Sequence, residues 1–352
     1  MIKLQRSVVR HIQAATRPEE LHHYLQKAVE LEHSTIPPYL TAMFSLMPGT
    51  NDAIARAIRE IVIEEMLHMT IAGNILIAIG GRPQINIPGF VPKYPGPLPM
   101  SIGGSEFRVG IEAFSMELLE NTFMKIEEPE HPIPIKTLAL DTVVEPEFAT
   151  IGEFYKAIQT KLAELGDSIF VVPPEQQVLQ WFSSDRLFPI THVDSAIRAI
   201  DIIVVEGEGT STRPFQTDGE LAHYYSFEEI LHRRRIVPAP GGGFAFGGEV
   251  IPFDPNGVYP MVPNPQDHDF KENTQARVRV EQFAYSYSSL LNVLHEAFNG
   301  QPKRINTALG LMYDLKVQAV SLMRTPVGPD SKLTAGPSFE YVNTQGGMRF
   351  AS

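Results

Sequence analysis

The chain has 352 residues, which suits one large domain or two medium-sized ones. Its 41 acidic side chains outnumber the 29 Lys and Arg, and the net charge of −12 argues against nucleic-acid binding, which needs dense positive charge. The absence of cysteine excludes disulfides, thiolate zinc sites, iron–sulfur clusters and cysteine nucleophiles. Any bound metal must therefore be held by His, Asp and Glu.

The N-terminal segment from Met1 to Arg10 mixes charged residues with isolated apolar ones and lacks the apolar core of a signal peptide. The most apolar stretch, Ile71 to Ile79, is shorter than the roughly 20 residues that cross a bilayer. We therefore expect a cytoplasmic protein with no membrane partner.

Apolar periodicity predicts an all-α protein whose residues 1–352 form a single domain. The core helices are expected over about 17–47, 51–80, 192–206 and 220–235. Segments rich in proline and glycine form two predicted insertions, 82–191 and 238–268, and 272–324 is predicted to be an additional C-terminal helical hairpin. Because a short turn joins the first two core helices, these two must lie antiparallel.

Local sequence signals predict where the first core helix begins and where it is interrupted. Thr16 to Glu19 has the form of a capping box and predicts the helix start. Pro37 and Pro38 each lack an amide proton, so we expect a kink or break just after Glu32.

Carboxylates and imidazoles recur on all four core helices. One Glu from each of two helices and Glu-x-x-His from each of the other two is the pattern by which helical bundles hold two metal ions, because i and i+3 side chains share a helix face. The candidate ligands are Glu32, Glu65, His68, Glu206, Glu220 and His223.

Spacing supports this grouping independently. Glu32 lies 17 residues before Gly49 and Glu65 lies 16 residues after it, so both fall roughly 25 Å from that turn at a rise of about 1.5 Å per residue. Glu206 and Glu220 flank a second loop. If the two loops lie at opposite ends, a long crossover must join the second and third helices, as in ferritin-like bundles, and residues 82–191 supply it.

The ligand types favour iron or manganese at two adjacent positions, with zinc as the alternative. Glu65 and His68 sit among apolar residues, where an unpaired charge would be costly, so partners or a metal are expected. A tyrosine after His223, in the run Tyr224-Tyr225, is the aromatic residue best placed to donate a hydrogen bond to bound oxygen.

Other residues compete with this choice. His33 points about 100° away from Glu32 round the helix, so we interpret it as a packed or hydrogen-bonded residue. Glu229 and His232 also form Glu-x-x-His, but they lie more than two turns further along their helix and rank lower. Glu64 is expected at the surface.

Several motifs resemble the ferritin-like domain family named for iminophenyl-pyruvate dimer synthase. They are Leu31-Glu32-His33-Ser34-Thr35-Ile36-Pro37-Pro38-Tyr39-Leu40, Glu64-Glu65-Met66-Leu67-His68, Glu206-Gly207-Glu208-Gly209-Thr210, Glu220-Leu221-Ala222-His223-Tyr224-Tyr225 and Gly336-Pro337-Ser338-Phe339-Glu340-Tyr341. The resemblance implies a ferritin-type bundle with inserted segments and, as activity, the oxidative coupling of two amino-acid-derived imines in bisindole pigment pathways.

These inferences lead to one main hypothesis and two alternatives. The main one is a di-iron carboxylate oxidoreductase that oxidises a small, amino-acid-derived molecule with oxygen or peroxide. The alternatives are a non-catalytic protein that stores or buffers metal or serves as a partner subunit, and a degenerate site kept as a scaffold. A small-molecule substrate is the expected partner, and the sequence leaves a homo-oligomer open.

Overall fold

The computed structural model describes residues 4–104, 106–129, 132–133, 135, 150–208, 213–216 and 219–342. Part of the predicted insertion 82–191 and two residues of a quoted motif, Gly209 and Thr210, lie outside these ranges. The described helices are α1 (Arg6–Ala14), α2 (Glu19–Ser45), α3 (Asp52–Ala78), α4 (Met116–Leu118), α5 (Met124–Glu127), α6 (Ile151–Leu165), α7 (Val193–Glu208), α8 (His223–His232), α9 (Gln275–Phe298) and α10 (Ile305–Leu322). The described strands are β1 (Arg234–Pro238) and β2 (Phe244–Val250).

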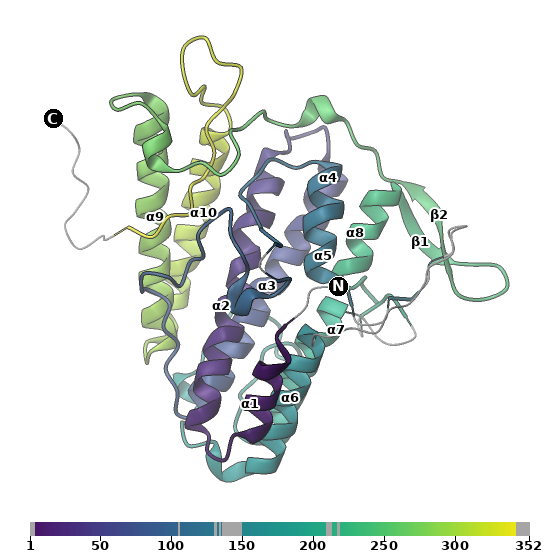
Figure 1. Ribbon diagram of the computed structural model, residues 1–352, viewed down its shortest axis with the longest axis vertical. Coiled ribbons are helices and arrows are strands. Elements are labelled where there is room, and N and C mark those ends of the chain that lie inside the picture. Colours follow the sequence, from purple (N-terminus) through teal and green to yellow (C-terminus); the bar gives the residue numbers. More distant parts are fainter. Residues whose placement is uncertain are drawn as a thin grey trace.

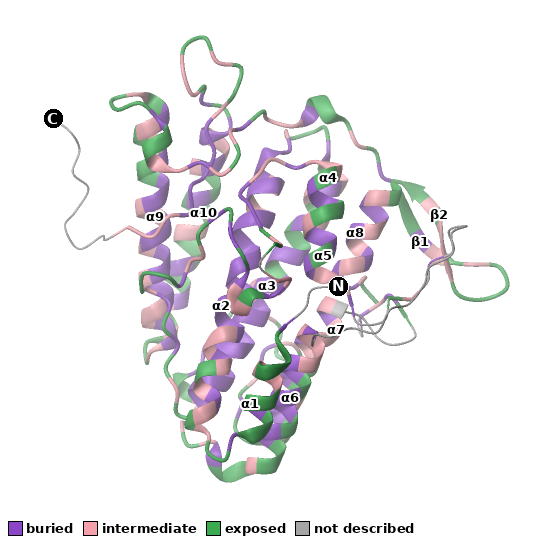
Figure 2. Cartoon of the chain, viewed as in Figure 1, coloured by how far each residue is buried: buried purple, intermediate pink, exposed green. Residues whose placement is uncertain are grey.

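Helices α2 and α3 form the centre of the protein, with α9 and α10 on one side and α5, α7 and α8 on the other (Figure 1). Most residues of the central pair are buried, whereas the outer faces of α9 and the β-hairpin are exposed (Figure 2). By length and composition α3 is the one described helix that could cross a membrane, but 89% of its most apolar window is buried within the protein, as in a core helix.

Helix α2 runs through Pro37 and Pro38 as one helix, so a break after Glu32, one of the two expected alternatives, does not occur. Pro38 cannot donate to the carbonyl of Ser34 four residues earlier. The hydroxyl of Tyr94 donates to that carbonyl instead, at 2.8 Å. Tyr94, a residue of the proline-rich insertion, thus supplies the hydrogen bond that Pro38 cannot donate to the carbonyl of Ser34.

The first insertion builds short helices beside the bundle. A single π-helical segment, Leu119–Phe123, joins α4 to α5. The capping box predicted at Thr150 and Glu153 is present and opens α6. Helix α6 packs against both α1 and α7, and it thereby ties the insertion to the bundle.

The fourth core helix is shorter than the predicted 220–235. Helix α8 begins at His223 and ends at His232, after which β1 and β2 pair as an antiparallel hairpin with Ile236 opposite Phe246. The hairpin turn contains Gly241, Gly242 and Gly243, all at positive φ, a conformation that costs glycine little.

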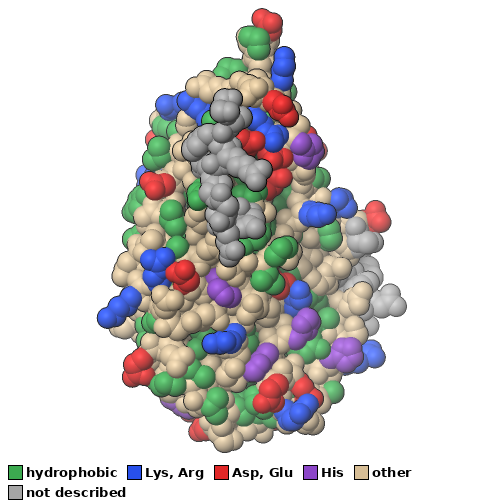
Figure 3. Space-filling view, turned by 90° about the vertical axis from the view of Figure 1, so that its left-hand side faces the viewer, with side chains coloured by type: hydrophobic (Ala, Val, Ile, Leu, Met, Phe, Trp, Pro, Cys, Tyr) green, Lys and Arg blue, Asp and Glu red, His purple; other side chains and the backbone are tan. Residues whose placement is uncertain are grey.

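The predicted C-terminal hairpin is present as α9 and α10, which pack against each other and beside α2. At one end, Phe298 fits against α3 where Gly73 has no side chain, since a Cβ there would lie 2.7 Å from the ring. At the other end, Tyr259 donates its amide to the carbonyl of Ser45, and its hydroxyl accepts from Arg324. Acidic and basic side chains are interspersed over the molecular face on the left-hand side of Figure 1 (Figure 3).

Candidate metal centre

The first part of the centre is formed by α2 and α3. Glu32, Glu65 and His68 each place one ligand atom within 4.8 Å of the others, and all three are buried. The Nδ1 atom of His68 lies 3.6 Å from Glu32 and 3.8 Å from Glu65. Thr35 donates its hydroxyl to Glu65 at 2.7 Å and holds that carboxylate between the helices.

The second part joins α3 to α5 and α8. Glu65, Glu127 and His223 form another group whose ligand atoms all lie within 4.8 Å. The Nδ1 atom of His223 lies 3.1 Å from Glu65 and 3.3 Å from Glu127. Glu65 therefore belongs to both groups, and the rings of His68 and His223 stack with their centroids 5.5 Å apart.

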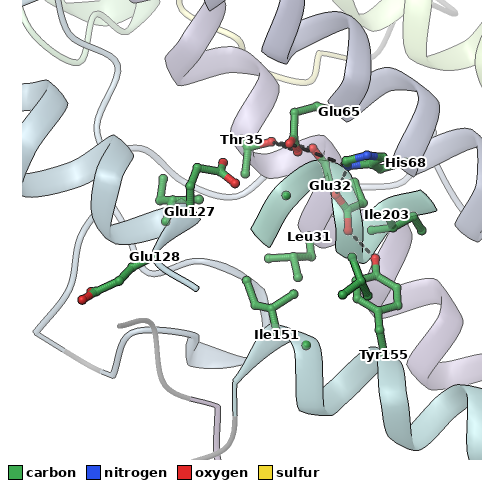
Figure 4. Close-up of a pocket in the computed structure, with 14 residues that line it drawn as sticks. Leu31, Glu32, Thr35, Glu65, His68, Glu127, Glu128, Ile151, Tyr155 and Ile203 are labelled. Atoms are coloured by element: carbon green, nitrogen blue, oxygen red, sulfur yellow. Dashed lines mark hydrogen bonds and ion pairs between the residues drawn. The ribbon is translucent and has the colours of Figure 1, made fainter. Parts of the chain in front are cut away.

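A small cavity of about 60 Å³ opens onto these groups, which is room for a few water molecules. Figure 4 shows Glu32, Glu65 and His68 converging at its wall, whereas Glu128 points away from them. Apolar side chains complete the lining, namely Leu31, Ile126, Ile151, Ile203 and Val204.

Two further carboxylates contact the outer nitrogens of the imidazoles, the Nε2 atoms. The Nε2 atom of His68 lies 2.9 Å from Glu206, and that of His223 lies 2.9 Å from Glu64. Arg186, from the segment before α7, bridges these carboxylates, at 2.9 Å from Glu64 and 2.6 Å from Glu206. Each imidazole thus has one nitrogen directed at the acidic groups and the other held by a carboxylate, which is how histidine ligands are commonly oriented around metals.

Two buried tyrosines orient the remaining acids. Tyr155 of α6 donates its hydroxyl to Glu32, and Tyr39 of α2 donates to Glu127. Burial, and then the nearby negative charge, raises the pKa of each tyrosine well above its ordinary value. Both phenols therefore remain protonated donors.

Charge crowding changes the acidity of the central groups. Burial, reinforced by the charges of Glu127 and Glu32, raises the pKa of Glu65 to about 7. Burial would lower the pKa of His68, but hydrogen bonds to Glu206 and Glu32 outweigh it and raise that pKa to about 10. In the metal-free protein this imidazole is a cation that compensates its acidic neighbours.

The other imidazole behaves similarly. Burial opposes its protonation, yet hydrogen bonds to Glu127, Glu64 and Glu65 raise the pKa of His223 well above its ordinary value. Burial would raise the pKa of Glu64, but its contacts with His223 lower that pKa to about 2. The cluster contains five carboxylates, Glu32, Glu64, Glu65, Glu127 and Glu206, against His68, His223 and Arg186 as cations.

This donor set fits two metal ions. Glu32, Glu65 and His68 would hold one ion, and Glu65, Glu127 and His223 the other, with Glu65 shared. Excess negative charge favours cations, and metal binding would displace the protons of the two imidazole Nδ1 atoms. The fold and the buried Glu/His cluster together suggest metal binding, without identifying the metal.

The structure brings together most, but not all, of the residues singled out from the sequence. Glu206 contacts the outer nitrogen of His68 and does not belong to either group of converging ligand atoms among the described residues. Glu220 is exposed and precedes α8. A bridge between Phe215 and Leu221 holds this segment in a non-helical turn, so Glu220 and His223 do not share a helix face.

The structure also shows the contacts of the residues that competed with this choice. His33 is hydrogen-bonded to Tyr287 at 2.8 Å, as expected. Glu64 is buried, and its expected surface position is wrong. Glu229 accepts from Arg235 and from the amide of Ile236, so it ties α8 to β1.

Sequence reasoning missed Glu127, Arg186 and Tyr155, and it gave the hydrogen-bonding role to a tyrosine near His223. Tyr225 instead accepts a hydrogen bond from the amide of Ile133. The one available signal for Glu127 was an acidic residue at the end of an apolar helical run, directly before Glu128-Pro129. Arg186 had no comparable signal because its partners are distant in sequence.

Comparison with known proteins agrees with this geometry. The family model described as Ferritin-like matches residues 25–232, which include most of α2, all of α3, α7 and α8, and all the cluster residues. The chain belongs to the ferritin-like family.

Two particular relatives extend the comparison. Dichlorochromopyrrolate synthase from Lentzea aerocolonigenes is 24% identical over 332 residues, which covers 83% of this chain but only 30% of the synthase. A crystal structure of a ferritin-like protein from Caulobacter vibrioides aligns with a TM-score of 0.59 at 23% identity, covering 91% of this chain and 97% of that one. The second likeness supports the fold alone.

Proposed function

We propose that this protein is a di-metal carboxylate oxidoreductase, with iron as the favoured metal, that oxidises a small amino-acid-derived molecule using oxygen or peroxide. The observation that carries the proposal is the convergence of two imidazole Nδ1 atoms on one shared carboxylate, Glu65, in a buried pocket. Carboxylate and imidazole ligands without thiolate suit iron and manganese. A pair of such ions, when bound, supplies the redox equivalents for activating oxygen or peroxide.

The protein's own residues would fix the ligands and protect the site. Tyr155 and Tyr39 orient Glu32 and Glu127, while Thr35 holds Glu65. Such hydrogen bonds limit ligand movement, and apolar side chains line the rest of the cavity.

The substrate class rests on similarity. The relative from Lentzea is named a synthase, and the sequence motifs resemble a family whose named activity couples amino-acid-derived imines. The chain spans less than a third of that synthase.

Metal content is the direct test. Protein purified without chelators is analysed for iron, manganese and zinc, beside Glu65→Gln and His223→Ala. Glu60→Gln is the control, because Glu60 lies exposed on the same helix. We expect about two ions per chain, lost in both cluster variants and retained in the control. An absence of metal, or equal content in all variants, would contradict the metal centre.

Catalysis is tested separately. The reduced, metal-loaded protein is mixed with oxygen in the presence and absence of aromatic amino acids and their imine derivatives. We expect oxygen consumption that the organic molecule accelerates, with formation of an oxidised organic product. Metal binding with consumption that no organic molecule changes would instead favour the storage or partner role.

A further inference from the structure

A second, much larger cavity lies on the other side of α2 and α3. Its volume is about 860 Å³, within the roughly 300–1,000 Å³ typical of small-ligand sites. Residues of α2, α3, α9 and α10 line it. The lining residues of α3 include Met66 and Met69, whereas the neighbouring Glu65 and His68 belong to the metal centre, so the two sites use different faces of one helix.

The cavity is long and apolar. Phe298 packs against Gly73 at one end, and Arg59 lies 14 residues earlier on α3, which corresponds to about 21 Å of helix. Methionine, leucine, isoleucine and phenylalanine dominate the lining between these points, and the methionines allow the walls to adapt in shape. These lining residues are Ile63, Met66, Met69, Leu290, Leu294 and Met312.

Positive charge lies at the rim. Arg56 and Arg59 line the cavity from α3, and Lys316 lines it from α10. Among the described residues none of the three has an ion-pair or side-chain hydrogen-bond partner, although the chain carries a net charge of −12. Asp52 is the one acidic residue of the lining, and its carboxylate accepts from the amide of Gly49.

The basic residues of α3 and α10 lie at similar distances from one end of these helices. Tyr259 links the end of α2 to Arg324, so the C-terminal end of α10 lies beside the N-terminal end of α3. Lys316 is eight residues from Arg324, about 12 Å, and Arg59 is seven residues from Asp52, about 10 Å. Arg59 and Lys316 therefore lie at a similar distance from this end of the helices, and both line the cavity.

The lining includes a further polar residue, on α2. His33 is buried, and its Nε2 is hydrogen-bonded to the hydroxyl of Tyr287. Its Nδ1 atom has no partner among the described residues. An unpartnered buried nitrogen is unfavourable, so a group in the cavity that bonded to it would be favoured.

We propose that this cavity binds an amphipathic carboxylate with a long apolar chain, of the fatty-acid class. The apolar chain would lie along the methionine- and leucine-lined walls, and the carboxylate would pair with Arg59 and Lys316 at the rim. An elongated cavity favours a chain over a compact ring system, and unpaired cations favour an anion over a neutral lipid.

The test uses the single tryptophan of the chain. Trp181 lines the cavity and is 37% exposed, so its fluorescence reports binding without any label. Palmitate is titrated into the full-length protein and compared with hexadecanol, the alcohol of the same chain length. We expect a saturable change with palmitate and at least about tenfold weaker binding of the alcohol, equivalent to about 1.4 kcal/mol.

Variants locate the site. Arg59→Gln and Lys316→Gln should each weaken palmitate binding several-fold, whereas Lys332→Gln, at an exposed position outside the lining, should not change it. Circular dichroism verifies that each variant is folded. Removal of metal with a chelator should leave binding unchanged, which separates this proposal from that for the metal centre.

Three results would overturn the inference. One is the absence of a saturable change with palmitate. Another is equal binding of palmitate and hexadecanol, or equal binding in all the variants, which would exclude recognition of the carboxylate. The third is a dimer in analytical ultracentrifugation that Ile63→Lys dissociates, combined with no palmitate binding, because the cavity would then be an interface between two copies.

Discussion

Arg186 provides the sharpest test of how the two imidazoles are held. Its guanidinium bridges Glu64 and Glu206, which are 5% and 6% exposed, and each carboxylate holds the outer nitrogen of one histidine. The substitution Arg186→Met keeps an extended side chain but removes the charge. Two buried carboxylates then lose their shared cation.

The expected loss of folding stability in Arg186→Met follows from these contacts. Removing one partner of a buried ion pair costs about 3–5 kcal/mol. We expect about 3 kcal/mol, at the lower end, because both carboxylates keep an imidazole and the arginine side chain is 25% exposed. With an unfolding entropy of about 2.1 cal/mol/K per residue, 352 residues give about 0.7 kcal/mol/K, so the melting temperature should fall by about 4 °C.

Metal affinity should change as well. Loss of a group that orients a histidine ligand typically lowers metal affinity about 10–100-fold. Thermal denaturation gives the stability change, and competition with a chelator, well below the melting temperature, gives the affinity. Arg304→Met is the matched control, since Arg304 pairs with Glu296 at the surface, where both side chains are about 40% exposed. If Arg186→Met behaved like this control in both assays, the bridging role would be refuted.

Three further predictions concern the same cluster. Glu127→Gln should lower metal content by about one ion per chain while Glu220→Gln leaves it unchanged, because Glu127, unlike Glu220, belongs to a group of converging ligand atoms with His223. Elemental analysis with the reverse result would favour the sequence-based choice. Tyr155→Phe should destabilise the protein by about 1 kcal/mol and weaken metal binding, since Glu32 loses a buried donor, and equal affinity for metal in the variant and the parent would contradict an orienting role. The stability of the metal-free protein should fall as pH rises from about 5 to 10, as measured by urea denaturation. The raised pKa of Glu65, about 7, means that the folded state retains a proton that the unfolded state loses near pH 4.5, and the stabilisation from His68 is lost between its ordinary pKa of 6.5 and about 10. Bound metal should oppose this loss increasingly at higher pH, and a stability that rose with pH in the metal-free protein would contradict the assigned protonation states.

Several local and periodic signals predicted the structure correctly, although the capping box expected at Thr16 to Glu19 is absent, since Glu20 rather than Glu19 accepts from the amide of Thr16. The pairing of Glu32 with Glu65 and His68 followed from distances along two helices that share a turn, and the capping box of α6 followed from residues three apart. The same reasoning placed Glu220 beside His223, because it assumed that the helix continued through residues 220–222. Long-range contacts of that segment, including a bridge between Phe215 and Leu221, delayed the helix start.

The sequence by itself determined the helical class, the central antiparallel pair and a ligand chemistry restricted to carboxylate and imidazole, because composition, periodicity and helical spacing are properties of the chain alone. Only the tertiary structure decided that Glu127 faces His223, that Glu64 and Glu206 hold the outer nitrogens, and that Arg186 joins them. These contacts join residues about 20 to 160 positions apart, and neither residue of such a pair constrains the local backbone of the other. Packing of the crossover against the bundle brings them together, and packing of α9 and α10 beside α2 forms the second cavity.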